Sequence, residues 1–416
     1  MKQENHSVEK SNNYKNAAKY MVYLLRAALN GTELTDLPAS CIWKMIWELA
    51  KRNCMEALIG HYIQKYGEAV PEEIRNAGKR AYNETLYRQV CFDLERENVV
   101  KNLEEQELAH LMLKGINISA YYPTAGTRWM SDNDILYGYI QPDKSGGYRA
   151  KGETTEEIQY WKKRAQDALQ TAMEKCDFSL KQRGACDETY VKLPMFKFEM
   201  HHQLFAKSFD EFKAQYYQNP WKRAIPDEQR PYLYCYSKED EYIYFVTHAY
   251  KHFSVSGSGI RTLGDVYVYI KNNESMNWDY ISCQLKILEL EEFENLLRNT
   301  AMHAFSADGK MTTKEWNTVF YMLGSGTFGT TQNRIKHSLE KLESNEKNSR
   351  NKMRRYIKER LWLSENKVME NFPFFYRHRF LRIFMPLYRL VKGMFIHPKT
   401  IWMEWKILFR TVKNKE

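Results

Sequence analysis

The sequence predicts an α+β fold with a small mixed β-sheet core, an N-terminal helical region and a C-terminal helical domain. Apolar residues recur at helical spacing from residue 14 to residue 115. Short β-prone runs cluster between residues 116 and 202, and the pattern is helical again after about residue 205. We therefore expect four segments: an N-terminal helical region (1–90), the sheet-containing core (91–215), a helical domain that lines the cleft (216–345) and a basic, aromatic helical tail (346–416).

One long helix is expected to connect the N-terminal helical region to the sheet-containing core. Residues 71–73, Pro-Glu-Glu, have the composition of a first helical turn, where Pro is tolerated. We expect this helix to continue through the charged segment 94–113. It should stop at Gly115, because Gly permits the backbone turn that helix ends often need.

Strands are expected after this helix. Residues 116–122 alternate in part between apolar and polar and end at Pro123. A turn at 124–127 and a second strand at 132–140 should follow, and residues 154–175 predict a helix. Further short strands are expected at 178–180, 190–193 and 196–202.

The composition indicates a globular protein of the reducing cytoplasm. The chain is 43% apolar, which is enough for a large core. Its seven cysteines are odd in number and scattered, and none forms a Cys-x-x-Cys pair. Residues 1–14 lack the apolar run of a signal peptide, and no stretch reaches the roughly 18 apolar residues of a membrane span. We therefore expect a soluble chain.

Positive charge is concentrated in the tail. The formal net charge is +10, and residues 350–416 hold 17 Lys or Arg against 5 Asp or Glu. Aromatic residues, Trp402 and Trp405 among them, are interspersed with these cations. The tail could bind RNA phosphates or lie on an anionic membrane surface, which would make the protein peripheral to the membrane. A solvated helical cap over the core is the alternative.

Two aspartates stand out in the run Ser131-Asp132-Asn133-Asp134-Ile135-Leu136. On a strand, residues two apart share one face, which would place Asp132 and Asp134 roughly 7 Å apart. Carboxylate oxygens are ligands that Mg²⁺ accepts together with substrate phosphates. An Asp-x-Asp before an apolar run is often only the start of a strand, so a third acid matters.

Glu199 is the natural third carboxylate. The run Phe196-Lys197-Phe198-Glu199-Met200-His201 alternates strictly, so Glu199 and His201 should share the polar face. Three carboxylates can hold two metal ions about 4 Å apart, the arrangement that supports displacement at an α-phosphate. We expect two Mg²⁺ ions, for which Mn²⁺ can substitute.

Further motifs lie around these acids. They are Leu113-Lys114-Gly115-Ile116, Gly126-Thr127-Arg128, Phe198-Glu199-Met200-His201, the run Thr247-His248-Ala249-Tyr250-Lys251-His252-Phe253, Gly259-Ile260-Arg261, Asp265, and Gly324-Ser325-Gly326-Thr327-Phe328-Gly329. Through these motifs the chain resembles a bacterial family of uncharacterised nucleotidyltransferases that belongs with the polymerase-β-like superfamily. The resemblance covers most of residues 90 to 400.

The resemblance implies a helix ending in a Gly that lets phosphates approach, two metal aspartates on a strand hairpin and a third acid on a later strand. These roles fall on Gly115, Asp132, Asp134 and Glu199. The wider superfamily usually carries Gly-Ser or Gly-Gly where this chain has Lys114-Gly115-Ile116. Lys114 and Arg128 could neutralise the triphosphate, or could be solvated surface cations.

The remaining candidates lie beyond residue 200. His248 and His252 are four apart on an expected helix, but they lack the Glu of a His-Glu-x-x-His zinc site. Together with Lys251, Arg261 and Asp265, they could form a polar wall that orients the nucleotide, or an ordinary buried hydrogen-bond network. His201 is a further candidate for this wall.

We therefore expect a metal-dependent transfer of an NMP from an NTP, such as ATP, to an acceptor hydroxyl or phosphate, with release of pyrophosphate. The acceptor, whether a sugar phosphate, a protein or RNA, is not specified by any residue. The alternative is a nucleotidyltransferase-like module that has lost turnover and senses nucleotides or binds a partner.

Overall fold

One seven-stranded mixed sheet organises the fold of the computed structural model, in the order β5-β6-β7-β2-β1-β9-β8. The structure describes residues 2–343, 349–396, 398, 401–404 and 406, so Trp405 of the tail lies outside the described residues. The strands of this sheet are β1 (Ala109–Leu113), β2 (Asn133–Gly138), β5 (Ser179–Arg183), β6 (Asp187–Lys192), β7 (Phe196–His201), β8 (Ile225–Pro226) and β9 (Leu233–Cys235). A separate hairpin joins β3 (Ile140–Pro142) and β4 (Tyr148–Ala150).

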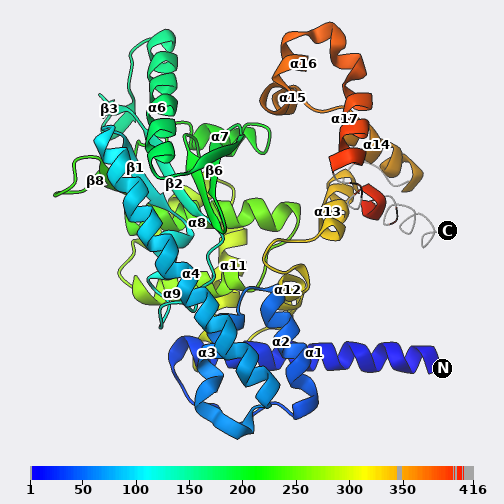
Figure 1. Ribbon diagram of the computed structural model, residues 1–416. Helices are drawn as coiled ribbons and strands as arrows, with labels where there is room; N and C mark the ends of the chain where they lie inside the picture. The colour runs from blue at the N-terminus through cyan, green and yellow to red at the C-terminus, as the bar shows by residue number, and fades with distance from the viewer. Residues whose placement is uncertain (1, 344–348, 397, 399–400, 405, 407–416) are drawn as a thin grey trace.

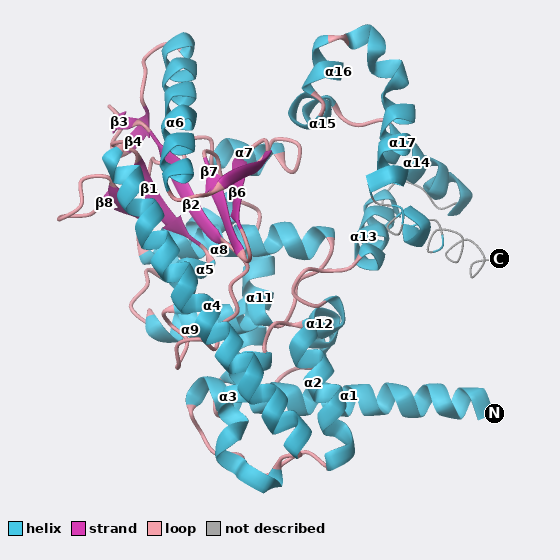
Figure 2. Cartoon of the chain, viewed as in Figure 1, coloured by secondary structure: helices cyan, strands magenta, loops and turns pink. Residues whose placement is uncertain are grey.

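Helices make up most of the described chain (Figures 1 and 2). Before the sheet come α1 (Lys2–Asn30), α2 (Ser40–Arg52), α3 (Glu56–Tyr62), η1 (Ile63–Ala69) and α4 (Glu72–Glu105). Between strands lie α5 (Gly115–Ser119), α6 (Thr155–Lys175) and α7 (Glu211–Tyr216). After the sheet follow α8 (Lys238–Val255), α9 (Arg261–Asn272), α10 (Trp278–Ile287), α11 (Glu291–Phe305), α12 (Thr313–Ser325) and α13 (Thr331–Glu343).

The tail contains α14 (Ser349–Leu361), α15 (Glu365–Asn371), α16 (Pro373–Arg377), η2 (Arg379–Phe384) and α17 (Met385–Ile396). None of the described helices combines the length and the apolar character that crossing a bilayer requires. The architecture confirms the predicted α+β class, with a mixed sheet and helices at both ends of the chain.

The centre of the sheet is where the polar chemistry of the chain gathers. Strand β2 pairs antiparallel with β1 and parallel with β7. This register sets Asp134 beside Leu113 on one side and beside Glu199 on the other. Because side chains alternate along a strand, one face of the sheet is apolar and the other carries the acids. The apolar face packs against α4 and α6 through residues that include Val99, Leu103, Ile135, Leu169, Met173, Phe198 and Met200.

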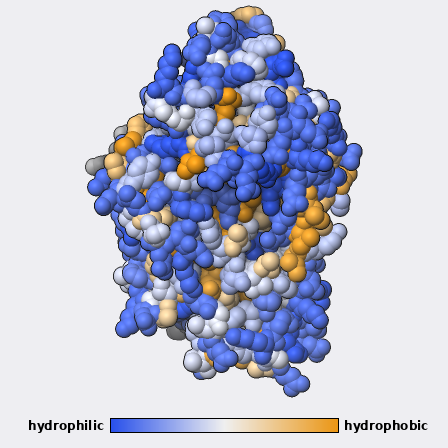
Figure 3. Space-filling view, turned by 90° about the vertical axis from the view of Figure 1, so that its left-hand side faces the viewer, coloured by the Kyte–Doolittle hydropathy of each residue, from blue (hydrophilic) through white to orange (hydrophobic). Residues whose placement is uncertain are grey.

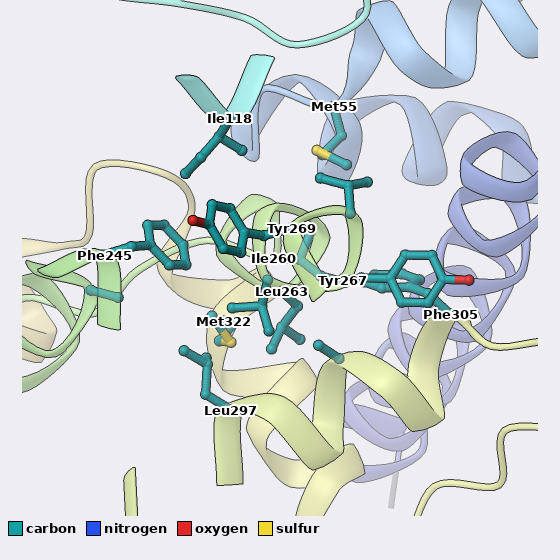
Figure 4. Close-up of a cluster of buried hydrophobic side chains, with 14 of the residues drawn as sticks. Met55, Ile118, Phe245, Ile260, Leu263, Tyr267, Tyr269, Leu297, Phe305 and Met322 are labelled. Atoms are coloured by element: carbon teal, nitrogen blue, oxygen red, sulfur yellow. The ribbon is translucent and has the colours of Figure 1, made fainter. Parts of the chain in front are cut away.

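The larger core extends from Leu111, Leu113 and Leu136 of the sheet to the helices around α9. Figure 4 shows Leu263 and Tyr267 of α9 among side chains from other elements, including Met55 just before α3, Phe305 of α11 and Met322 of α12. The side chain of Arg26 in α1 donates hydrogen bonds to the carbonyls of residues 303, 304 and 309. The N-terminal helices are therefore packed onto the helices that follow the sheet.

The predicted long helix ends earlier than expected. It stops at Glu105, and Glu107 then takes a left-handed backbone conformation with φ of 55°. Glu107 provides the left-handed residue that often follows a helix end. Because this residue is not a Gly, the sequence pattern did not indicate that the helix ends here. Residues 109–113, expected to be helical, instead form β1. A short apolar run has no periodicity that separates a buried strand from a helix.

Two further expectations about the sheet were wrong. Residues 116–122, expected as a strand, contain the short helix α5 followed by turns, because partial alternation over so few residues carries little information. The expected strand 132–140 is shorter, since β2 covers Asn133–Gly138. Strands β8 and β9 were not expected after residue 205, and their brevity explains why. The helix at 154–175 and the three strands after it are confirmed.

Glu56, in the first turn of α3, provides a test of this packing. One of its carboxylate oxygens is buried without a hydrogen-bond partner among the described residues. Burial raises the pKa of Glu56 to about 7. Because the folded state holds this proton more tightly than the unfolded chain, the contribution of Glu56 to stability falls as pH rises from about 4.5 through about 7.

We predict that Glu56→Gln, which keeps the side chain neutral, leaves stability nearly unchanged at about pH 5 and raises it at about pH 8. Urea unfolding at the two pH values measures this difference. Glu48→Gln on the exposed side of α2 is the control. Equal pH dependence of the Glu56→Gln variant and the wild type would show that Glu56 is not the titrating group.

Candidate active site

Asp134 lies at the centre of the candidate site, on β2 between β1 and β7. Its Oδ1 accepts hydrogen bonds from Lys114 Nζ at 2.7 Å and from His201 Nε2 at 2.8 Å. Burial by itself would raise the pKa of Asp134, but the Lys114 ammonium and the His201 hydrogen bond outweigh it and hold the pKa below its ordinary value. Asp134 is therefore a buried carboxylate that remains ionised.

Lys114 is placed by the turn that joins β1 to α5. Its backbone has φ of 56° and ψ of −119°, a combination that residues with a side chain seldom adopt. Burial would lower the pKa of its ammonium, but the charge of Asp134 raises it above the usual range. The residue with this unusual backbone is therefore also the one that forms the buried ion pair with Asp134.

Gly115 begins helix α5, whereas the sequence predicted that it ends the preceding helix. A Cβ atom at this position would lie 2.8 Å from Nη1 of Arg128. The absence of a side chain is therefore required for the close approach of the guanidinium. The observed order is strand, Lys-Gly turn, helix, so that the backbone of this turn lies beside Asp134.

Glu199 and Asp132 complete the group of acids. Lys197 Nζ lies 2.5 Å from Glu199 Oε1 and 3.1 Å from Asp132 Oδ2, so a single ammonium bridges the two carboxylates. Burial, followed by the negative charges of Asp134 and Asp132, raises the pKa of Glu199. Asp132 directly precedes β2, and the hydroxyl of Ser131 donates to it at 2.8 Å. Three carboxylates thus share one face of the sheet with two lysines.

The donor atoms fit a divalent cation. One ligand atom from each of Asp134, Glu199 and His201 lies within 4.8 Å of the other two. Carboxylate oxygens suit Mg²⁺ and Mn²⁺, and an imidazole nitrogen is accepted more readily by Mn²⁺. The crowding of acids that raises the pKa of Glu199 would be relieved by a bound cation. Asp132 lies outside this closest group and is connected to it through Lys197.

Helix α8 presents polar side chains toward these acids. Tyr244, His248, Lys251 and His252 recur at the spacing of one helical face. The Nε2 atoms of His248 and His252 lie 3.2 Å apart. Burial and the nearby ammonium groups of Lys251 and Lys114 lower the pKa of His252 to about 4, and burial lowers that of His248 as well. Both imidazoles are therefore neutral at pH 7.

Lys251 is a cation of different character from Lys114. Its Nζ lies 5.9 Å from the ring centres of both Phe205 and Phe209. Burial, followed by the charge of Lys114, lowers the pKa of Lys251. A positive group held near another ammonium and over aromatic rings gains from an approaching anion.

Arg128 and Asp265 form a buried ion pair. Arg128 donates from Nε and Nη2 to the two carboxylate oxygens of Asp265, at 2.8 Å each, and the Tyr122 hydroxyl donates to the same carboxylate at 2.8 Å. Arg128 is therefore not a solvated surface cation. The pair favours a structural role for Arg128, whose contact with a triphosphate stays a prediction. Arg261 donates to the carbonyl of Trp129 at 3.0 Å and so holds the same loop.

Two basic residues of this site received no role from the sequence. Lys197 bridges Asp132 and Glu199, and its position was readable from the alternation that also placed Glu199. Arg88 of α4 donates to the carbonyls of Met130, Ser131 and Met195, and so joins the loop before β2 to the turn before β7. No local pattern distinguishes Arg88 from other arginines on a helix.

Comparison with known proteins agrees with this geometry. Residues 40–306 match the model of a family described as an uncharacterised nucleotidyltransferase. No curated protein and no solved structure matches the chain. The matched region contains α4, β1, β2, β7, α8 and α9, and therefore every acid and base of the candidate site. The chain belongs to this nucleotidyltransferase family, and is thus a transferase of phosphorus-containing groups.

Proposed function

We propose that the protein transfers an NMP from an NTP, such as ATP, to an acceptor hydroxyl or phosphate and releases pyrophosphate, with Mg²⁺ as the metal and Mn²⁺ as a substitute. The observation that carries this proposal is the register of β2 and β7, which sets Asp134 beside Glu199 with Asp132 bridged to them. Family membership supports nucleotidyl transfer in general. The free state of all seven cysteines supports a reducing, cytoplasmic location.

The acids have distinct roles in this proposal. Asp134, Glu199 and Asp132 would hold the metal, which supplies positive charge at the α-phosphate and at the departing pyrophosphate. In the reaction, an acceptor oxygen forms a bond to the α-phosphorus, the bond from the α-phosphorus to the bridging oxygen breaks, and the acceptor proton passes to solvent. His201, hydrogen-bonded to Asp134, would keep that carboxylate oriented.

The bases have roles on either side of the acids. Lys114, in the turn after β1, holds Asp134 in its ionised form. On α8, Lys251 and the neutral imidazoles of His248 and His252 would contact the β- and γ-phosphates as donors. Arg261 would keep the loop before β2 in place through Trp129.

The first test is nucleotidyl transfer itself. Purified protein is incubated with each α-³²P-labelled NTP, with Mg²⁺ or Mn²⁺, and with cell extract as a source of acceptor. We expect label transfer by the wild type and a loss of about 100-fold or more in Asp134→Asn and in Glu199→Gln, because a missing ligand weakens stabilisation of the transition state. Asp167→Asn, on the exposed side of α6, is the control.

The outcomes separate the proposal from its main alternative. Binding of NTP without transfer by the wild type, across all nucleotides and extracts, would favour a module that senses nucleotides. Retained activity in both acid variants would remove these residues from the metal site. Loss of activity in the Asp167→Asn control would point to a general effect on folding.

A second prediction distinguishes Lys251 from Arg128. Lys251→Met should raise the KM for the NTP about tenfold or more, because a charge-assisted contact to phosphate is lost, while the unfolding midpoint stays near that of the wild type. Arg128→Met should instead destabilise the fold by about 3–5 kcal/mol, because it leaves Asp265 buried without its partner. Steady-state kinetics and urea unfolding of both variants test the two expectations. A raised KM with normal stability in Arg128→Met would contradict the structural role and support a contact between Arg128 and the nucleotide.

A further inference from the structure

The tail carries an exposed apolar surface that the proposed nucleotidyl transfer does not use. Along α17, the side chains of Leu387, Tyr388, Val391, Met394 and Phe395 are all exposed, and Phe395 is 83% accessible. Their spacing of three or four residues places them on one side of the helix. We call this set the apolar stripe. It continues onto η2, where Phe380, Ile383 and Phe384 are also exposed.

The contacts that hold α17 lie mainly on the side opposite the stripe, although the ring of Tyr388, at the edge of the stripe, packs against Phe372 and Phe375. Met385, on the opposite side of α17, is buried. Arg389, also on that side, donates to the carbonyls of Arg360 and Leu361 at 2.6 and 3.1 Å. These contacts attach α17 to α14 by its other face, so none of them covers the stripe. In Figure 1 α17 lies away from α6, while α15 contacts the segment after β7 through Glu370, which accepts a hydrogen bond from Ser208 N at 3.1 Å.

Most of the exposed large apolar side chains in the described part of the chain lie between residues 362 and 403, and a smaller group lies on α4 at Tyr87, Val90 and Leu94. The face shown in Figure 3 is largely hydrophilic, with apolar residues in small scattered groups. A continuous apolar surface on a protein of this kind generally marks a site of interaction. We therefore expect a binding partner for the apolar stripe, and the positive charge of the tail indicates the chemistry of that partner.

Cations surround the stripe. Arg377 and Lys392 lie next to it in sequence, and Lys392 Nζ sits 5.6 Å from the Tyr388 ring centre. Glu365 forms ion pairs with both Arg379 and Arg382, so one carboxylate is shared between two guanidinium groups. Residues 350–416 as a whole hold 17 basic and 5 acidic residues. The binding partner of the stripe should therefore have an anionic surface that attracts the cations and an apolar layer beneath it that receives the apolar side chains.

We propose that α17 and η2 dock this protein on an anionic lipid bilayer, with the apolar stripe inserted between the headgroups and the cations above it. A helix of 12 residues is about 18 Å long, which is too short to cross the hydrocarbon layer but suits a helix lying in the interface. Tyr and Trp prefer that interface, and Tyr388 and Trp402 are both exposed.

Two other occupants fit the observations less well. RNA would use the cations and could stack on aromatic rings, but it gains little from exposed aliphatic side chains such as Leu387, Val391 and Ile383. A second copy of the chain would bring the same positive tail against this one, because symmetric contacts pair like surfaces. An anionic bilayer satisfies both the apolar and the charged part of the surface.

The test is flotation of the full chain with lipid vesicles. We expect the wild type to float with vesicles of phosphatidylcholine and phosphatidylglycerol, to bind phosphatidylcholine alone more weakly, and to lose binding as salt increases. The triple variant Leu387→Ser, Val391→Ser, Phe395→Ser should reduce binding by more than about tenfold. Because these side chains are exposed, thermal unfolding should be unchanged.

A matched control comes from α4. Tyr87→Ser, Val90→Ser, Leu94→Ser removes three side chains of comparable exposure and spacing, and it should float like the wild type. Arg377→Gln with Lys392→Gln should reduce the preference for anionic over neutral vesicles.

Several results would overturn the proposal. They are a wild type that does not float, a tail variant that floats equally well, or a control variant that is impaired to the same degree. Stripe-dependent gel shifts of single-stranded RNA without vesicle binding would assign the tail to RNA. A dimer lost only in the tail variant would assign it to a second copy. Nucleotidyl transfer to a soluble acceptor, measured in parallel, separates failure here from failure of the proposed reaction.

Discussion

The buried carboxylate of Asp134 is the constraint on which the site depends. A charge removed from water is costly unless it is paired, and here Lys114 in the turn after β1 and His201 on β7 supply the pairing. Both partners are correctly placed only if β1, β2 and β7 are adjacent in the observed register. The pairing of Asp134 therefore depends on the sheet order, on the turn at Lys114 and on the face that β7 presents.

The neutralising lysines also explain how so many acids can share one face. Lys114 pairs with Asp134, and Lys197 lies between Asp132 and Glu199. Each ammonium occupies a place where positive charge is favoured, which is the property that a bound metal ion would use. The bases of α8 add donors on the other side. The site is thus organised around charge compensation, with the apolar face of the sheet held rigid by α4 and α6.

One ion pair and a set of hydrogen bonds from distant arginines hold the loop that leads into β2. Arg128 reaches Asp265 on α9, and Arg88 on α4 binds the carbonyls on either side of Ser131. These contacts connect the acids to the larger helical core, so that the position of Asp132 depends on helices on both sides of it in sequence. The tail differs in kind, because its outward surface is apolar and its attachment to α14 uses the opposite face.

The sequence by itself determined the α+β class, the faces of β7 and the family. Strict alternation from Phe196 to His201 is enough to separate apolar from polar side chains, because a strand has a period of two. Only the tertiary structure decided that Glu107 ends a helix and that Arg128 pairs with Asp265. A left-handed residue without Gly leaves no local signal, and a pair separated by more than a hundred positions is formed by packing, which local patterns do not encode.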